Sequence, residues 1–566
     1  MRFTMPQPLA LTWLVPILLT LTGGPLAAAQ EPDEPPPPEP PQDLTAPPSG
    51  YLNADSLRDE LLKLEKSYGR LELSRLRVTL DETPIYLATF RSPQFAATRP
   101  EALIIANLEG DRPVATEVAM AIIRDLATSG SPWDKVGTLH VIPVANPDAY
   151  ARVMAGQLPT RGAPVDEDRD GRLDENGPSD VDGDGKILWL RAPTQAGHWY
   201  ANPKDPRASE PVEGASPKPG AFQLRREGWD EDGDRRYVED PPGGIQVDAN
   251  FPHLWPQYEP KAGPYPLSEP ESLILAQFLL SRKKLAWVLV LDDEDNLASP
   301  PKGVDKVDQY SRDPLQEDAL FLKAWGERLY PKKAKDDSDE PDPRWTKPES
   351  GPQGAGNLAD WAYFQLGLFT MESAIWTMPA EGGDADATTE TKRLAWSDEH
   401  YKRGAFTPWK DFEHPEMGKV QIGGWSPLVL NNPPAEWLTD LGVRYMKFVD
   451  GLAADFARLE WTEVHVQPLD GEGVLEIRAK LANVGFLPTT SAMEAKTRSK
   501  LPIMVELRLP EGSRVLVGNA RSQIQRLEGG GGAEDLRWIV QVPKGSAAPV
   551  LYAQCNTAGE ATYTLE

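Results

Sequence analysis

Cysteine and histidine are scarce in this sequence, and their scarcity limits the chemistry open to the protein. The 566 residues contain a single Cys, Cys555, and six His. One Cys excludes a framework of internal disulfides, and it excludes a zinc site built on several thiolates. Metal chemistry based on several imidazoles must be equally sparse, because so few His are present.

Basic residues are also in deficit. Lys and Arg number 59 against 86 Asp and Glu, which gives a formal net charge of -27. Nucleic acids and anionic membranes are polyanions that require a basic surface, so neither is expected as a partner. The acidity belongs to a folded protein, because 40% of the residues are hydrophobic and 17 are Trp. The length suggests more than one folded unit.

Long apolar runs are absent except near the start of the chain. Residues 1–29 resemble a secretory signal, with Arg2 at the start, a mostly apolar stretch over 9–21 and a small-residue cleavage site at 27–29. A signal anchor is the alternative, although the apolar stretch is short for a spanning helix and contains Pro16. We therefore expect an exported mature protein, periplasmic or extracellular, without a membrane span.

The remaining sequence divides into three parts that differ in composition and in hydrophobic pattern. Residues 30–49 are dominated by Pro and acids, which is typical of an extended linker. Residues 50–455 alternate helix and strand patterns, and 285–291 (LAWVLVL) is a continuous apolar run typical of a central parallel strand. This alternation predicts an α/β domain with helices on both faces of its sheet. Residues 460–566 carry short alternating strands punctuated by Gly and Pro, which predicts a β-sandwich.

Four short segments of the α/β region match a known family in chain order. They are NPDAY at 146–150, VDANFP at 247–252, GPYPLSEPES at 263–272 and GNLADWAYFQLGLFTMES at 356–373. In this order they resemble the zinc metallocarboxypeptidases of the carboxypeptidase A type. The resemblance implies a mixed, mostly parallel central sheet with the site at the carboxyl ends of its strands. It also implies a peptidase that works with zinc.

The positions at which the family holds zinc carry other residues here. The family's His-Gly-x-Glu segment aligns with residues 106–112, so that Glu109 replaces the His and Arg112 replaces the Glu. The family's later His aligns with Asp292. An Arg guanidinium carries only donors and a fixed positive charge, so it cannot bind zinc and would repel it. We expect that zinc is lost and that Arg112 bridges Glu109 and Asp292 as an ion pair.

The substrate-binding positions are altered as well. The family's Asn-Arg pair for a terminal carboxylate aligns with Asp248 and Ala249, and an Asp there would repel that carboxylate. The Arg that polarises the scissile carbonyl aligns, across an insertion, with Arg191. Glu372 matches the family's general base, but without zinc the pKa of a water is not lowered. Glu372 is therefore either a retained base or a structural hydrogen-bond or ion-pair partner.

An acidic insertion, about 155–243, contains two loops with carboxylates at positions 1, 3 and 5, Gly at 6 and an apolar residue at 8. This is the first two-thirds of an EF-hand calcium loop. The twelfth positions are Gly177 and Arg191, so other residues such as Asp174 or Glu175, or water, must complete the site. We expect structural calcium, with solvated acidic turns as the alternative; the candidate ligands are Asp166, Asp168, Asp170, Asp180, Asp182 and Asp184.

Two functions remain open on the sequence. The first is an exported, non-catalytic carboxypeptidase-like binding module whose partner is a peptide or a cell-envelope component. The second is an active metallocarboxypeptidase that carries out proteolysis with an unusual, oxygen-rich site of Glu109, Asp292, Asp293 and Glu372, which would suit a harder cation than zinc. The position of Arg112 discriminates between them, because a guanidinium inside the pocket excludes the enzyme.

Overall fold

The protein is described here by a computed structural model. It covers residues 50–565 except for short gaps, which are 92–98, 130–131, 158–161, 167–170, 175, 213–217, 232, 234, 240, 242, 332–346, 350–353, 381–386 and 402–404. The predicted signal and linker, residues 1–49, lie outside the described residues, as do Asp168 and Asp170 of the first acidic loop. The described residues belong to one compact unit, 42–566.

None of the helices in the described part of the chain combines the length and the apolar composition that a bilayer crossing requires.

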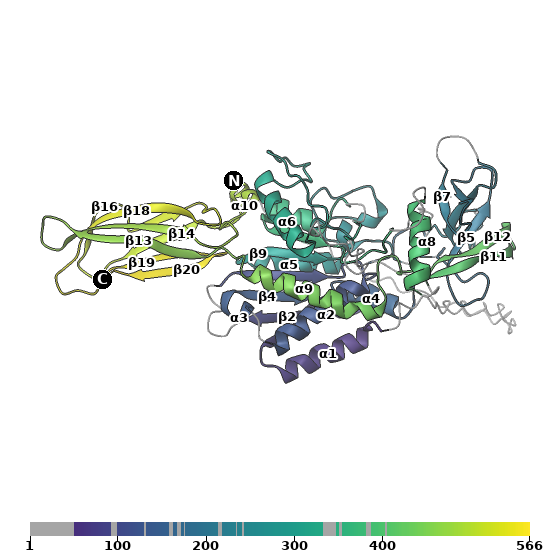
Figure 1. The fold of residues 1–566 in the computed structure, drawn as a ribbon, viewed down its shortest axis with the longest axis horizontal. Coiled ribbons are helices and arrows are strands. Elements are labelled where there is room, and N and C mark those ends of the chain that lie inside the picture. Colours follow the sequence, from purple (N-terminus) through teal and green to yellow (C-terminus); the bar gives the residue numbers. More distant parts are fainter. Residues whose placement is uncertain are drawn as a thin grey trace, which may run out of the picture. The chain divides into compact units, whose positions relative to one another are not determined.

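A six-stranded mixed sheet forms the centre of the α/β domain (Figure 1). Its strands, in spatial order, are β1 (Leu71–Val78), β2 (Pro84–Arg91), β4 (Thr138–Ile142), β3 (Glu101–Ala106), β9 (Leu285–Leu291) and β10 (Phe369–Ser373). The pairs β4–β3, β3–β9 and β9–β10 are parallel, whereas β1–β2 and β2–β4 are antiparallel. The predicted α/β fold with a mixed, mostly parallel sheet is confirmed.

Alternation along the central strands assigns helices to the two faces. Ala102, Ile104 and Ala106 of β3 pack in one apolar cluster with helices α1, α2, α6 and α9, whereas Leu103 and Ile105 pack in another with α5 and α7. The ten helices assigned in the described residues are α1 (Ala54–Ser67), α2 (Pro113–Thr128), α3 (Trp133–Val136), α4 (Pro147–Met154), α5 (Pro270–Ser281), α6 (Gln316–Leu329), α7 (Leu358–Leu366), α8 (Thr389–His400), α9 (Leu438–Ala453) and α10 (Ala492–Thr497).

Helix α1 shows how the sequence specifies these elements. Asn53 caps the first turn by accepting a hydrogen bond from the Ser56 amide, and the Ser56 hydroxyl accepts one from the Asn53 amide. Leu57, Leu61 and Leu64 then recur at helical spacing and are buried against the sheet. Short 3₁₀ turns occur at η1 (Val247–Ala249), η2 (Pro260–Ala262) and η4 (Ala435–Trp437).

The acidic insertion contributes strands to a second sheet. Four of its strands join two strands from residues 406–425, and the order is β11 (Phe406–His414), β12 (Gly418–Trp425), β5 (Trp189–Pro193), β8 (Phe222–Arg226), β6 (Trp199–Ala201) and β7 (Ser209–Pro211). The contact between the two parts is the antiparallel pair β12–β5. A small apolar cluster of Val181, Leu188, Leu190, Val420 and Ile422 closes one face of this sheet.

The C-terminal region forms two four-stranded antiparallel sheets that share one core, as expected for a β-sandwich. The first sheet contains β13 (Leu459–Pro468), β14 (Val474–Asn483), β18 (Gly532–Gln541) and β16 (Arg514–Val517). The second contains β17 (Arg521–Ile524), β15 (Ile503–Arg508), β19 (Val550–Cys555) and β20 (Gly559–Thr564). Asp318 on α6 accepts hydrogen bonds from the amides of Ala492 and Met493, so the α/β domain and the sandwich are in contact.

Candidate functional site

The altered catalytic positions meet at one edge of the central sheet. Glu109 follows β3, Asp292 follows β9, and Glu372 is the penultimate residue of β10. These three strands are parallel neighbours, so their carboxyl ends lie at the same edge, where the ligand sites of open α/β sheets form. The structure therefore brings together the residues that the sequence assigns to this site.

Asn107 shapes the turn that presents Glu109 and Arg112. It is fully buried and has a φ of 58°, a left-handed conformation that Asn tolerates better than most residues. Its Oδ1 accepts a hydrogen bond from the Arg112 amide at 3.0 Å, and its Nδ2 donates one to Thr116 Oγ1 at 3.0 Å. The turn thus passes directly into α2 with Arg112 immediately before the first helical residue.

Asp292 binds the same turn from β9. Its Oδ2 accepts hydrogen bonds from the amides of Leu108 at 2.6 Å and Glu109 at 3.1 Å. Burial raises the pKa of Asp292 well above its usual value, and the charges of Asp293 and Glu109 act in the same direction, whereas Arg112 opposes them. The protonated form is therefore favoured, and one carboxylate oxygen is already occupied by backbone donors.

Arg112 lies inside this cluster of acids. Its side chain is 10% exposed, with Nε 3.8 Å from Asp111 Oδ1 and Nη2 3.8 Å from Asp293 Oδ2. The ion pairs given by the structure thus differ from the predicted bridge between Glu109 and Asp292. One oxygen of each carboxylate is held by the backbone, since Asp292 Oδ2 accepts from backbone amides and Glu109 Oε1 accepts a hydrogen bond from the Asp248 amide at 2.8 Å.

The two residues at the carboxylate-clamp position lie in η1. Asp248 accepts a hydrogen bond from the Leu358 amide at 2.8 Å, which ties this turn to the start of α7. Burial raises the pKa of Asp248 well above its usual value, with the charge of Glu294 as the next cause. Ala249 is buried and offers no polar side chain. The arrangement joins structural elements and presents no cation to a peptide carboxylate.

Glu372 is buried among hydrogen-bonding partners. Its Oε2 accepts a hydrogen bond from Asn296 Nδ2 at 3.2 Å, and Asn296 also pairs with its backbone. The neighbouring Glu294 carboxylate is held by the Gly354 amide at 2.6 Å and Asn357 Nδ2 at 2.7 Å. The two carboxyl groups lie close enough that, in addition to burial, the charge of Glu294 raises the pKa of Glu372.

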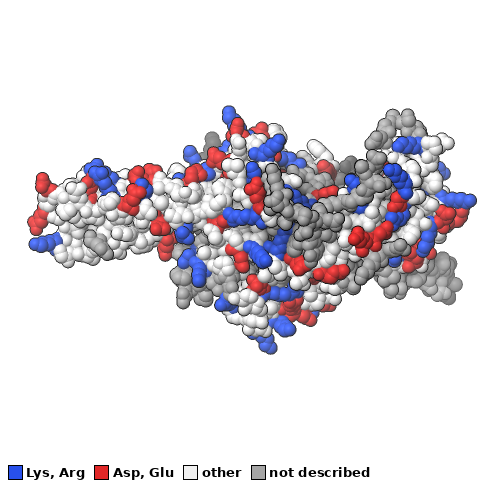
Figure 2. Space-filling view, in the orientation of Figure 1, with Lys and Arg blue, Asp and Glu red and all other residues white. Residues whose placement is uncertain are grey.

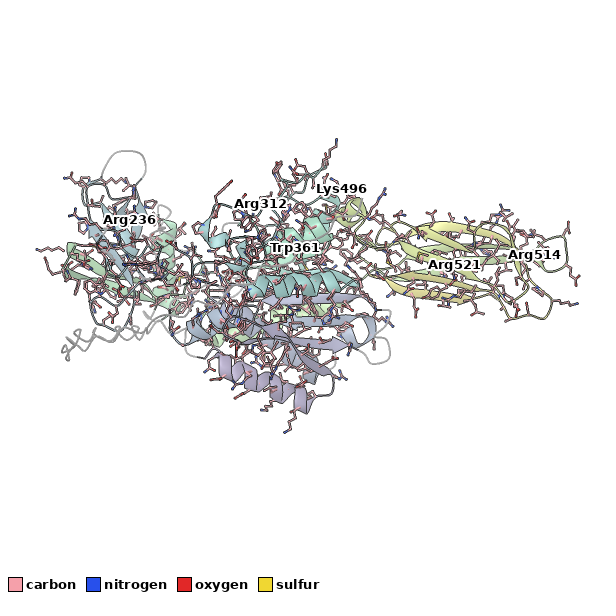
Figure 3. The ribbon with its side chains drawn as sticks, turned by 180° about the vertical axis from the view of Figure 1, so that it is seen from behind. Arg236, Arg312, Trp361, Lys496, Arg514 and Arg521 are labelled. Carbon is pink, nitrogen blue, oxygen red and sulfur yellow. The ribbon has the colours of Figure 1, made fainter. Side chains whose placement is uncertain are left out.

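The electrostatics of this site favour the protonated form of Glu372. Burial raises the pKa of Glu372 well above its usual value, and the charges of Glu294, Asp360 and Asp248 add to the effect. Asp360 itself has its pKa raised to about 7 by burial, opposed by Arg312, whose Nε lies 3.6 Å from it. Figure 3 labels Arg312 and Trp361, the residue that follows Asp360. We refer to Glu109, Asp248, Asp292, Glu294 and Glu372 as the edge cluster.

Sequence comparison assigns this domain to a family. The family model described as zinc carboxypeptidase matches residues 58–376, which is more than half of the chain. The chain belongs to the zinc carboxypeptidase family. A second family model, a domain of unknown function (DUF8731), matches residues 458–566, which are the β-sandwich. No match was found among curated proteins.

Solved structures of carboxypeptidases align with the chain at low identity. Bovine thrombin-activatable fibrinolysis inhibitor, in complex with tick carboxypeptidase inhibitor, is 11% identical over 71% of this chain and 96% of its own, with a TM-score of 0.36. Carboxypeptidase A from Helicoverpa armigera is 12% identical over 71% and 74%, with a TM-score of 0.36. A metallo-carboxypeptidase from Burkholderia cenocepacia is 11% identical over 70% of each chain, with a TM-score of 0.30.

The side chains at the zinc positions of this carboxypeptidase family member do not fit zinc. Arg112 offers only donors and is buried where a ligand would stand, and no imidazole occupies either His position. Within the described ranges, one place brings together at least three ligand atoms of acidic, His or Cys side chains within 4.8 Å of one another. Its residues are Asp180, Asp182 and Glu227. That place is in the insertion and not in the edge cluster.

Arg191 lies away from the edge cluster, on β5 of the second sheet. Its guanidinium donates to Ser209 Oγ at 2.7 Å and to the carbonyls of Pro206 at 2.9 Å and Arg207 at 2.8 Å. It also stacks over the Trp409 ring at 3.9 Å. Burial lowers the pKa of Arg191 to about 10. These contacts hold it within the second sheet, and its role in substrate binding stays a prediction.

An aromatic pocket of about 440 Å³ lies beside the β3–α2 turn, because Asp111 is part of its lining. Its walls come mainly from the second sheet and the residues that follow it. The aromatic side chains that line it are Trp189, Trp199, Phe406, Trp409 and Trp425. The charged ones are Asp111, Arg207, Arg226 and Glu390. The sequence alone assigns no role to these tryptophans, because only the pairing of β5 with β12 brings them together.

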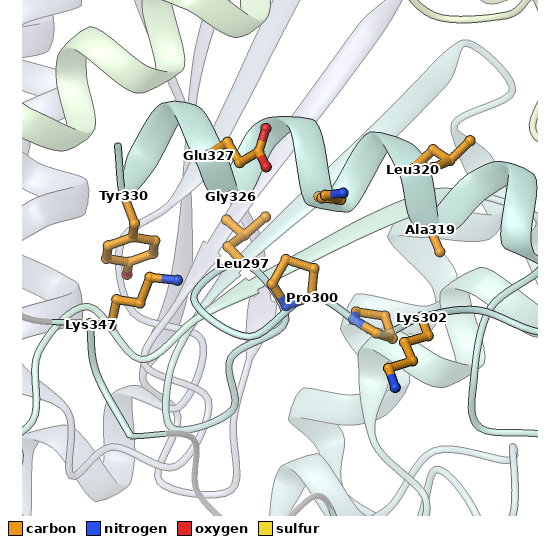
Figure 4. A pocket seen from close by; sticks show the side chains of 11 residues that line it. Leu297, Pro300, Lys302, Ala319, Leu320, Gly326, Glu327, Tyr330 and Lys347 are labelled. Atoms are coloured by element: carbon orange, nitrogen blue, oxygen red, sulfur yellow. The ribbon is translucent and has the colours of Figure 1, made fainter. Parts of the chain in front are cut away.

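A second pocket, of about 430 Å³, lies between the loop that follows Asn296 and helix α6 (Figure 4). Lys302, Lys323 and Lys347 line it together with Glu327 and Tyr330. None of the lining residues belongs to the edge cluster or to the substrate-binding positions of the family. The pocket is therefore separate from the site that the family resemblance identifies.

Proposed function

We propose that this protein is a non-hydrolytic member of the zinc carboxypeptidase family that binds a peptide ligand. The observation that carries the proposal is the buried Arg112 guanidinium, which stands at a zinc-ligand position with Asp111 and Asp293 at 3.8 Å. A fixed cation there opposes the binding of any metal cation by the neighbouring carboxylates. The second sequence-based function, an active enzyme with an oxygen-rich metal site, is disfavoured by the same guanidinium.

The state of Glu372 supports the loss of hydrolysis. A general base must be deprotonated and must reach a water molecule. Burial instead raises the pKa of Glu372, which favours its protonated form, and Glu372 accepts a hydrogen bond from Asn296 and is 5% exposed. Its role is then to complete a buried hydrogen-bonded cluster, which was the structural alternative raised by the sequence.

The aromatic pocket supports a binding role. Ligand pockets combine apolar walls with a few polar groups that orient the ligand, and this pocket has five aromatic side chains with charges of both signs. A peptide offers matching apolar side chains, amides and charged termini. On the face shown in Figure 2, the Lys and Arg side chains of the described residues are interspersed with Asp and Glu, which fits a small ligand better than a polyanion. We place this binding outside the cytoplasm, on the strength of the signal-like residues 1–29.

Hydrolysis is tested with blocked dipeptides and longer peptides that carry a free carboxyl terminus. Wild-type protein and Glu372→Gln are incubated with each substrate in zinc, in calcium and in chelator, and release of the terminal residue is followed by mass spectrometry. We expect both proteins to match the buffer control under all three conditions. Release by the wild type that disappears in Glu372→Gln would overturn the proposal.

Binding is tested separately by calorimetry with a set of short peptides. Trp199→Ala removes one aromatic wall of the pocket and should weaken the tightest peptide about tenfold, the size of effect expected for an aromatic binding residue. Tyr200→Ala is the matched control, because adjacent side chains of β6 point to opposite faces and Tyr200 stacks with Lys218. Equal losses in both variants, or no peptide bound by the wild type, would contradict this pocket as the peptide site.

A further inference from the structure

Three carboxylates from distant positions in the insertion converge on one point. One ligand oxygen from each of Asp180, Asp182 and Glu227 lies within 4.8 Å of the other two. Asp180 and Asp182 occupy positions 1 and 3 of the second acidic loop, whereas Glu227 follows β8 about forty residues later. The sequence pattern alone does not indicate Glu227, which no motif connects with the loop.

Backbone hydrogen bonds fix Glu227 between the two ends of the loop. The Ser179 amide donates to the Glu227 carbonyl at 3.0 Å, and the Glu227 amide donates to the Leu188 carbonyl at 3.2 Å. The second bond extends the β5–β8 ladder, in which Trp189 is opposite Arg226. In an EF-hand the twelfth residue of the loop would supply a bidentate Glu, but here that residue is Arg191. Glu227 takes that place from the neighbouring strand.

The Glu227 side chain is fully buried, and neither of its oxygens has a hydrogen-bond partner among the described residues. A buried carboxylate without a partner is costly, because it loses hydration and gains nothing in return. Burial raises the pKa of Glu227 to about 8, the Leu188 backbone amide opposes this shift, and the charges of Asp182, Asp180 and Asp184 add to it. Three acidic groups, Asp180, Asp182 and Glu227, thus converge at this point.

The loop is arranged to direct oxygens toward Glu227. Asp180 Oδ1 accepts from the Gly183 amide at 2.8 Å and Oδ2 from the Gly185 amide at 2.8 Å, which fixes its orientation. Gly183 and Gly185 have φ values of 71° and 82°, which permit the tight turn. The basic side chain whose charge acts on Asp182 is Lys410, and its effect is the smallest of the causes that shift that group. Neither a single proton nor Lys410 compensates most of the negative charge of these carboxylates.

We propose that Asp180, Asp182 and Glu227 bind one calcium ion that joins the second acidic loop to strand β8. A site made only of carboxylate and carbonyl oxygens favours a hard cation, and the flexible geometry of calcium accepts a bidentate Glu better than magnesium does. Asp184, at position 5 of the same loop, is available to ligate directly or through water.

The ion stabilises the part of the second sheet that forms the aromatic pocket. Val181, between the two Asp ligands, and Leu188 pack against Val420 and Ile422 of β12. Trp189, which follows Leu188, and Arg226, which precedes Glu227, both line the aromatic pocket. Calcium would therefore hold in place the strands that supply one wall of that pocket. This proposal stands independently of peptide binding, because its ligands and its test involve only the ion.

The test uses the full mature chain, stripped with chelator and then titrated with calcium chloride by calorimetry. Glu227→Gln keeps the shape of the side chain and removes its charge. We expect this variant to bind one equivalent fewer than the wild type, or to bind that equivalent at least about tenfold more weakly. The calcium-dependent rise in Tm should shrink accordingly. Glu413→Gln, on an exposed position of β11 in the same sheet, is the matched control and should titrate like the wild type.

Folding and site identity are checked in the same series. In chelator, Glu227→Gln should melt at or above the Tm of the wild type, because the amide replaces a buried carboxyl group whose ionised form is unfavourable there, so a loss of calcium binding cannot be ascribed to misfolding. Terbium luminescence excited through Trp229, two residues from Glu227, should fall in Glu227→Gln and not in Glu413→Gln. No uptake of calcium by the wild type, or equal stoichiometry and affinity in Glu227→Gln, would overturn the proposal.

Discussion

The edge cluster and the Asp180–Asp182–Glu227 site are both crowded with buried carboxyl groups, yet they balance their charge differently. In the edge cluster, carboxyl groups accept hydrogen bonds from backbone amides and Asn side chains, and Arg112 lies beside them, although Asp292 Oδ1 has no hydrogen-bond partner among the described residues. In the insertion, both oxygens of Glu227 lack such a partner among the described residues. The chain thus supplies donors and a cation to most of the edge cluster, whereas it leaves the Glu227 carboxylate without a hydrogen bond.

The comparison shows that a set of acidic residues does not by itself indicate a metal site. What decides is whether the chain supplies its own donors and cations. The edge cluster occupies the family's catalytic position, but the chain itself places the Arg112 guanidinium beside it. The insertion, which has no counterpart in the family motif, retains an uncompensated set of oxygens. Variants that change the charge balance of each region should therefore have opposite effects.

The largest effect is expected from Arg112→Met, which leaves the acids of the edge cluster without this cation. Breaking a buried ion pair typically costs about 3–5 kcal/mol of unfolding free energy, and we expect about 3 kcal/mol because the pairs at 3.8 Å are long. Urea unfolding at neutral pH with saturating calcium measures it. Arg58→Met, in an exposed pair with Asp55, is the control and should change stability by less than about 0.5 kcal/mol. A neutral or stabilising Arg112→Met would contradict the role assigned to the guanidinium.

The next prediction concerns pH and follows from the raised pKa values of the edge cluster. A carboxyl group whose pKa is higher in the folded state takes up a proton on folding. Its contribution is therefore greatest below the unfolded pKa, and stability falls as pH rises toward the folded pKa. For Asp360, whose folded pKa is about 7, the fall should lie between about pH 4 and 7, and for Glu372 it should begin near pH 4.5 and continue toward its raised pKa, with a slope of up to about 1.4 kcal/mol per pH unit for each group.

Glu372→Gln tests this sign, because the amide imitates the protonated carboxyl group. The variant should match the wild type near pH 4.5 and be more stable at pH 8, so that its plot of unfolding free energy against pH is flatter. Urea melts across this range, with calcium kept saturating, give both plots. Parallel plots for the two proteins would show that Glu372 ionises normally in the folded state.

The sequence predicted the α/β sheet and the location of the edge cluster, and the physical reasons are clear. Apolar runs such as Leu285–Leu291 specify buried parallel strands, and residues that follow such strands must meet at one edge. The partners of Arg112 were not predictable. Both Glu109 and Asp292 are present as expected, but one oxygen of Asp292 is held by backbone amides of the turn that the buried Asn107 shapes, and one oxygen of Glu109 by the Asp248 amide of η1.

The Asp180–Asp182–Glu227 site and the aromatic pocket both depend on strand pairings that no local sequence pattern indicates. Asp180 and Asp182 are visible in the spacing of the loop, but Glu227 is brought to them by the β5–β8 ladder. The aromatic pocket likewise depends on strands from residues 406–425 joining the insertion. Long-range antiparallel pairing has no periodic signal that links its two partners, so the residues it brings together are evident only in the structure.

The smallest stability effect is expected for Asp111→Asn, and it separates the structural role of the edge cluster from a binding role. Asp111 is one of two acids at 3.8 Å from Arg112, so neutralising it leaves Asp293 in place and should cost less than about 1 kcal/mol. Asp111 also lines the aromatic pocket. If a peptide binds there, the variant should change its affinity and the salt dependence of that affinity while the unfolding free energy barely moves. Calorimetry and urea unfolding on the same preparation measure both quantities. A large loss of stability with unchanged peptide affinity would assign Asp111 to the charge balance of the cluster alone.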